Sequence, residues 1–109
     1  MPKRQNISRY DSTEVQGPDS YVEIRRFTVA EAVEYRDTAK QPEFDEFLYG
    51  LDLIRKHVVS WNWVDNDDNP LPLPTDDPNA ILSLTDREVA FISSRVRGNV
   101  TEQELGKSD

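Results

Sequence analysis

The chain has 109 residues, enough for one domain, and its 36% hydrophobic and 31% charged residues predict a modest core. Its formal net charge of −8 disfavours bare nucleic acid and anionic membranes as partners, because like charges repel. The sequence has no cysteine and no apolar run near the ~20 residues that span a bilayer, which excludes disulfides, thiolate metal sites and a membrane-spanning helix.

Residues 1–20 are polar and aperiodic, and Gly17 and Pro18 interrupt them, so we expect a disordered or extended N-terminal tail. The early basic residues Lys3, Arg4 and Arg9 leave a docking arm as the alternative. No apolar run follows them, as a secretory signal would need, so the expected location is the cytoplasm in which the chain is made.

A short strand is predicted over residues 21–27, because Val22 and Ile24 alternate there with charged residues. A single strand needs a partner to satisfy its backbone hydrogen bonds. We expect that partner either near Val64 or on another subunit.

A capping box predicts the next helix, over residues 28–39. In such a box Thr28 and Glu31 would each accept a hydrogen bond from the other residue's free backbone N–H. The apolar stripe of this helix consists of Val29, Ala32, Val33 and the aliphatic stem of Arg36. The stripe is thin, and Tyr35 lies off it, so we expect the helix to cover an edge of the core.

The strongest periodicity in the chain predicts a helix over residues 43–60. Its apolar side chains recur at spacings of three and four residues: Phe44, Phe47, Leu51, Ile54, Val58 and Trp61. Leu48 and Val59 widen this stripe. The basic Lys56 and the single histidine, His57, fall in the last turns, where positive charge suits the helix dipole. His57 is therefore interpreted as a dipole partner and not as a catalytic base.

Trp61 and Trp63 stand close together after this helix. Tryptophans often mark binding hot spots, but they more often anchor a core, so core packing is favoured and a protein interface is the alternative. Stacking on nucleobases is disfavoured, because Asp65, Asp67 and Asp68 would repel a phosphate backbone.

An Asp/Asn-rich turn places Asp65, Asp67 and Asn69 at the first three ligand positions of a calcium-binding loop. Pro70 stands where that loop needs glycine, and Asp76 stands where it needs the longer glutamate. We therefore expect an exposed turn with no metal and no cofactor. The alternating prolines that follow predict an extended polyproline II segment.

The C-terminal part predicts two further helices. Pro78 suits the first turn of a short helix over residues 79–84. Thr85 and Glu88 form a second capping box, which begins a last helix that Gly98 should end. The apolar face of that helix is Val89, Ile92 and Val96.

These elements predict a mainly α fold, a small helical domain of three to four helices with a short N-terminal β-strand and flexible termini. The expected organisation is a tail over 1–20, a helical domain over 21–98 and a flexible tail over 99–109. No glycine-rich phosphate loop, nucleophile elbow or zinc motif is present, so we do not expect an enzyme.

An apolar stripe within an acidic chain predicts protein binding instead. The candidate protein-binding residues are Phe44, Phe47, Leu51, Ile54, Val58, Trp61 and Trp63. Assembly into a homo-oligomer stays open.

A resemblance sharpens this hypothesis. Residues 58–65 read Val-Val-Ser-Trp-Asn-Trp-Val-Asp, and residues 70–75 read Pro-Leu-Pro-Leu-Pro-Thr after an acidic turn. This pattern resembles tail assembly chaperones of long-tailed bacteriophages, especially those of actinobacteria, over roughly residues 21–97. In that family such a string joins two helical halves. Asn69 stands where relatives often have glycine, and asparagine tolerates a left-handed backbone.

The resemblance implies a protein that binds the aggregation-prone tape measure protein while tail tube subunits assemble around it. The tape measure protein and the tail tube protein are thus the implied partners. The implied location is the host cytoplasm, and the chaperone is expected to be absent from the mature virion. The alternatives are a structural head–tail or tail component retained in the virion, and an acidic protein-binding regulatory module.

Overall fold

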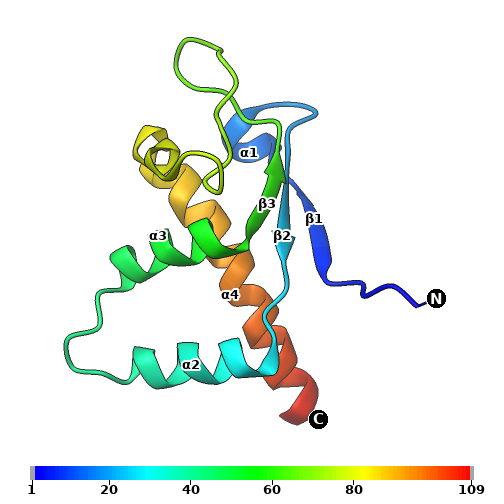
Figure 1. Cartoon of the computed structure of the whole chain (residues 1–109), viewed down its shortest axis with the longest axis vertical. Coiled ribbons are helices and arrows are strands. Elements are labelled where there is room, and N and C mark those ends of the chain that lie inside the picture. The colour runs from blue at the N-terminus through cyan, green and yellow to red at the C-terminus, as the bar shows by residue number, and fades with distance from the viewer. Residues whose placement is uncertain (1, 109) are drawn as a thin grey trace.

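The computed structural model describes the backbone of residues 2–108 and the side chains of residues 2–97. It contains a three-stranded antiparallel sheet and about 47% helix (Figure 1). The elements in chain order are β1 (Ile7–Asp11), α1 (Thr13–Gln16), β2 (Tyr21–Arg25), α2 (Val29–Ala39), α3 (Glu46–His57), β3 (Val58–Trp61), the 3-10 helix η1 (Pro78–Ser83) and α4 (Asp86–Ser108). The fold class is therefore α+β, and the prediction of a mainly α fold is wrong.

Residues 1–20, which the sequence predicts as a tail, contain strand β1 and helix α1. Strand β1 pairs with β2 along its whole length, beginning with Ile7 opposite Arg25. The segment also reaches the core, since Ser12 is buried and its backbone N–H donates to the Ser20 carbonyl at 3.1 Å. The tail interpretation missed these elements because most side chains of β1 are polar and alternate ones face solvent.

Strand β2 confirms the predicted strand and lies in the middle of the sheet, whose order is β1-β2-β3. Val22 and Ile24 are fully buried, and the side chains between them point to the opposite face. Val22 lies opposite Trp61 of β3. The second partner is thus β3, whereas Val64 forms an isolated bridge with Pro70.

Helix α2 begins with the predicted capping box. The Thr28 hydroxyl accepts from the Glu31 N–H at 3.2 Å, and the Glu31 carboxylate accepts from the Thr28 N–H at 2.9 Å. The predicted apolar stripe is only partly right, because Val29 is 74% exposed and Val33 is exposed as well, whereas Ala32 packs against the core. Tyr35, which lies off that stripe, also packs on the core, edge to face with Phe27 at a centroid distance of 6.1 Å.

Helix α3 is shorter than the predicted helix over residues 43–60. It begins at Glu46, where Asp45 caps it by accepting from the Leu48 N–H at 3.0 Å. At Val58 the backbone becomes extended (φ −76°, ψ 121°), and the chain enters β3 with no loop between. Pairing with β2 explains the change, because two adjacent valines favour a strand over a helix.

The tryptophan side chains belong to the core. Their rings stack with centroids 5.1 Å apart and planes 3° from parallel. Trp61 Nε1 donates to the Leu71 carbonyl at 3.0 Å, and Trp63 Nε1 donates to the Ser12 hydroxyl at 2.9 Å. Only 8% of Trp61 and 1% of Trp63 is exposed, which confirms the core-packing interpretation.

Helix α4 begins with the second predicted capping box. The Glu88 N–H donates to the Thr85 hydroxyl at 3.1 Å, and the Thr85 N–H donates to Glu88 Oε1 at 2.9 Å. The helical backbone continues past Gly98 to Ser108, so the predicted end of this helix is wrong. The predicted flexible tail covers residues 99–109. The side chains of these residues, and the whole of the last residue, lie outside the described part of the chain.

The acidic turn is built around one carboxylate. Asp65 Oδ1 accepts from the backbone N–H groups of Asp67 at 2.9 Å and Asn69 at 3.0 Å. The left-handed residue is Asp68 (φ 63°), not Asn69. Within residues 2–97, whose side chains the structure describes, no cluster of three or more His, Cys, Asp or Glu is placed to hold a metal. In the same range, no helix has the length and apolar character needed to cross a membrane.

Replacement of Ser12 by alanine should lower the free energy of unfolding by about 1–3 kcal/mol, because it leaves the buried Trp63 Nε1 without an acceptor. Chemical denaturation followed by tryptophan fluorescence measures the change. The control is Ser83→Ala at an exposed serine, which should change stability by less than about 0.5 kcal/mol. Equal stability of Ser12→Ala and the unaltered chain would mean that this bond does not hold the N-terminal segment.

Candidate protein-binding groove

The seven predicted binding residues fall into two groups. The buried group is Ile54, Val58, Trp61 and Trp63. These four belong to the core and have almost no surface to offer a partner. Leu51 is half-buried and packs against that core. Phe44 is half-buried and Phe47 is 57% exposed, so only the N-terminal part of the predicted stripe reaches the surface.

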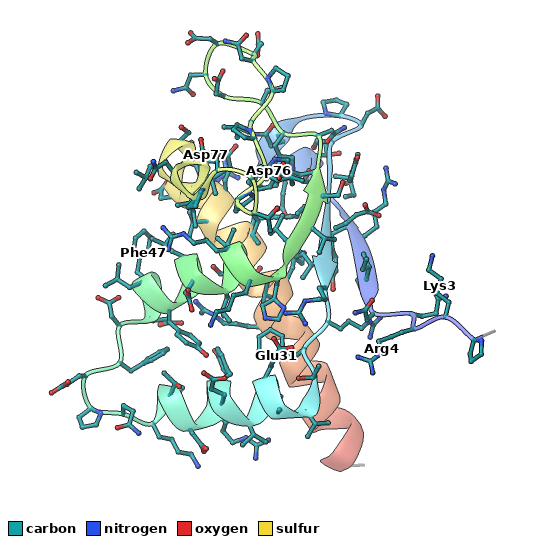
Figure 2. All side chains as sticks on the ribbon, in the orientation of Figure 1. Lys3, Arg4, Glu31, Phe47, Asp76 and Asp77 are labelled. Carbon is teal, nitrogen blue, oxygen red and sulfur yellow. The ribbon has the colours of Figure 1, made fainter. Side chains whose placement is uncertain are left out.

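A groove of about 800 Å³ lies between the start of α3 and helix α4. Residues 42–47 form one wall, to which Phe44 and Phe47 contribute aromatic rings. Val89 and Ala90 contribute apolar surface from the α4 wall. Figure 2 shows Phe47 at the outer end of α3, far from the sheet. The groove is therefore open to another molecule and partly apolar.

Phe44 lines both this groove and a second hollow of about 440 Å³, which reaches Thr38 at the end of α2. Tyr49 lines this hollow, and its ring lies 5.4 Å from that of Phe44 and 5.5 Å from that of Tyr35. Leu48, which is 60% exposed, lines it as well. Phe44, Phe47 and Leu48 together form an apolar surface with a hollow on each side, and we call these three residues the docking face.

The groove carries a net charge of −3, since four carboxylates line it with a single guanidinium. The guanidinium of Arg97 forms an ion pair with Glu46 across the groove. Glu43, Asp45 and Asp86 are exposed, and none of them forms an ion pair with another described side chain. These three carboxylates lie on both walls, because Asp86 begins α4 whereas the other two precede α3.

Ser93 lies on the α4 wall of the groove. Among the described residues, its hydroxyl is the buried side-chain polar atom that lacks a hydrogen-bond partner. It faces α3 at Gly50, where an added Cβ would stand 3.0 Å from Ser93 Oγ. Glycine at this position thus allows the close crossing of α3 and α4 beside the groove.

The sequence did not indicate the α4 wall as part of a site. The sequence places Val89 on the apolar face of the last helix, and no pattern in it singles out Ala90 or Ser93. Ser93 follows Val89 by four residues and Ala90 by three, so a helix places it next to both of them on one surface. The sequence gives no sign that this surface meets the start of α3, because that contact depends on the fold.

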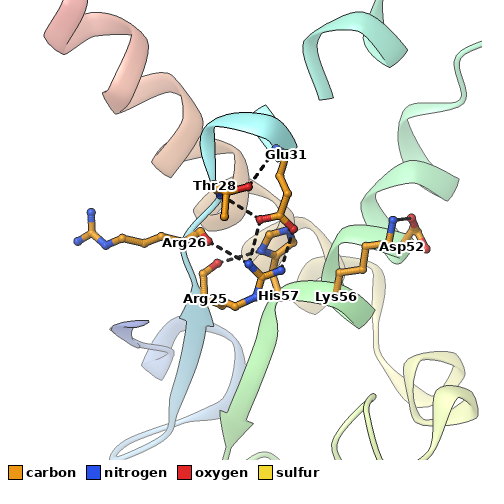
Figure 3. A network of polar contacts seen from close by, with 7 residues as sticks. All are labelled: Arg25, Arg26, Thr28, Glu31, Asp52, Lys56 and His57. Carbon is orange, nitrogen blue, oxygen red and sulfur yellow. Dashed lines mark hydrogen bonds and ion pairs between the residues drawn. The ribbon is translucent and has the colours of Figure 1, made fainter. Parts of the chain in front are cut away.

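His57 lies in a polar network that joins β2, α2 and α3 (Figure 3). Its Nδ1 donates to the Arg25 carbonyl at 2.9 Å, and its ring stacks on Phe27 with centroids 4.3 Å apart. Burial lowers the pKa of the His57 imidazole. A buried, neutral ring packs and donates a hydrogen bond, so it does not supply the charge that was predicted for the helix end.

Glu31 provides the acidic side of the same network. It accepts two hydrogen bonds of 2.9 Å from the Arg25 guanidinium, which lower the pKa of Glu31 to about 2. His57 Nε2 lies 4.0 Å from Glu31 Oε2. The network stabilises the junction of three elements, and its histidine is too buried to reach a substrate.

Comparison of the chain with protein-family models, with curated proteins and with solved structures gave no match. The interpretation of the groove therefore depends on its own geometry and on the sequence resemblance described above.

The substitutions Gly50→Ala and Ser93→Ala should be coupled in stability. Alone, Gly50→Ala gains up to about 1 kcal/mol of helix propensity but places a methyl group 3.0 Å from Ser93 Oγ, so the net gain should vanish. Ser93→Ala removes a buried unpaired hydroxyl and should stabilise by about 1 kcal/mol. The double variant should then exceed the sum of the single effects in a denaturation cycle. Additivity within about 0.3 kcal/mol would argue against the close approach.

The stability of the chain should begin to fall as pH decreases from about 7 through about 6.5, the ordinary pKa of histidine in an unfolded chain. The folded pKa of His57 is lowered, so in this window the unfolded chain binds a proton that the folded chain does not. The expected slope is at most about 1.4 kcal/mol per pH unit. Glu31 adds its own loss only below its unfolded pKa of 4.5. Denaturation at several pH values gives the slope of the unfolding free energy against pH. This slope should be shallower for His57→Gln than for the unaltered chain. Equal slopes would mean that His57 is not the group responsible.

Proposed function

We propose that this chain binds an apolar segment of another protein at the docking face and keeps that client soluble. One observation carries the proposal. Phe47 and Leu48 are 57% and 60% exposed at one helix end, beside the half-buried Phe44 and between two hollows. Covering such side chains contributes about 25 cal/mol for each Å² of apolar surface removed from water. The hollows allow side chains of the client to insert between those of the chain.

The resemblance to phage tail assembly chaperones supplies the identity of the client. On this proposal the client is the tape measure protein, and the tail tube protein is the component that later replaces the chaperone. The chain would act in the host cytoplasm and be absent from the mature virion. The resembling string itself forms β3 and the loop before η1, so it supports the family by sequence and lies outside the docking face.

The acidic character of the chain suits this role. A chaperone must expose apolar side chains to its client without associating with other copies of itself. A net charge of −8 opposes such association, because the copies repel one another. The exposed carboxylates next to the docking face place part of this charge where the apolar side chains lie.

The double variant Phe47→Ser/Leu48→Ser should lose retention of a soluble tape measure fragment, because the exposed apolar surface of the docking face is removed. The expected loss is at least tenfold in affinity, which corresponds to about 1.4 kcal/mol. Size-exclusion co-elution and titration calorimetry measure it.

The matched control is Ile7→Thr, at another exposed apolar side chain on the first strand. This variant should retain the fragment, and circular dichroism should show that both variants are folded. The proposal would be overturned if the double variant retained the fragment, or if the unaltered chain did not retain it.

A further inference from the structure

We infer that the occupant of the groove between α3 and α4 is an amphipathic helix with a basic residue on each side of its apolar stripe. This inference rests on the proposed function and states the chemistry of the client. Two features of the groove support it: its apolar surface and the position of its charges.

The apolar surface is suited to a helix. It consists of Phe44 and Phe47 on one wall and of Val89 and Ala90 on the other. Both walls are formed at helices, since residues 42–47 lead into α3 and the opposite wall is α4 itself. A third helix laid in such a groove buries side chains spaced three and four residues apart.

The charges determine what must flank that stripe. Glu43 and Asp45 stand on one wall and Asp86 on the other, and no described cation is paired with any of them. The one cation of the groove, Arg97, is already paired with Glu46. An occupant with lysine or arginine on both sides would neutralise these carboxylates, whereas an acidic occupant would be repelled.

The test uses two fluorescent helix-forming peptides of about 18 residues. Both carry a leucine stripe, flanked on both sides by lysine in the first and by glutamate in the second. Fluorescence anisotropy with the full chain should show that the lysine peptide binds at least tenfold more tightly. Its affinity should also fall between about 0.05 M and 0.5 M salt, because screening weakens exposed charge pairs.

The variant Glu43→Gln/Asp45→Asn/Asp86→Asn should weaken the lysine peptide about tenfold, which corresponds to about 1.4 kcal/mol. Asparagine at position 45 keeps the helix cap, so the fold is preserved.

The matched control is Asp67→Asn/Asp68→Asn/Asp76→Asn, which removes the same charge from exposed residues outside the groove. It should change the affinity for the lysine peptide less than twofold, because these carboxylates do not line the groove.

Three outcomes would overturn the inference: equal binding of the two peptides, no binding of the lysine peptide, or equal weakening by both triple variants. The proposed function is tested separately. If the unaltered chain retains the tape measure fragment and Phe47→Ser/Leu48→Ser does not, the proposed function stands even when this inference fails.

Discussion

The direct passage from helix α3 to strand β3 determines where the rest of the structure can lie. No loop separates His57 from Val58, so the pairing of β3 with the central strand β2 also fixes the direction of α3. The ion pair of Arg25 and Glu31 joins the end of β2 to the start of α2. His57 contacts both residues, so the end of α3 is held at this place as well. Helix α3 therefore points away from the sheet and carries Phe47 at its far end (Figures 1 and 2).

The elements that the sequence predicts well are those whose signal is local. Both capping boxes form as predicted, because Thr28 and Thr85 find their glutamates three residues away. The central strand is also predicted, since its alternation of buried and outward side chains can be read within five residues. Strands β1 and β3 are different. Each is a strand because it pairs with β2, and Trp61 pairs across almost forty residues of chain with Val22.

The candidate site was only partly predictable for a related reason. Spacings of three and four residues continue from Phe44 to Trp61 although the helix ends at His57, so one pattern spans two different environments. The pattern shows which side chains share a face, and it does not show what covers that face. Helix α4 covers α3 around Gly50 and leaves Phe47 exposed. The binding residues could be separated from the core residues only once that crossing was known.

Exposure of an apolar side chain does not by itself mark a binding site, since Val29 and Leu82 are each 74% exposed. The groove differs because exposed apolar and acidic side chains meet there. Its facing walls carry the exposed carboxylates of Glu43, Asp45 and Asp86, and no described cation is paired with them. Phe47 leaves an aromatic ring in water beside them. On the proposal above, one basic amphipathic occupant would cover the Phe47 ring and neutralise the carboxylates of both walls, a combination that a single exposed side chain such as Val29 does not offer.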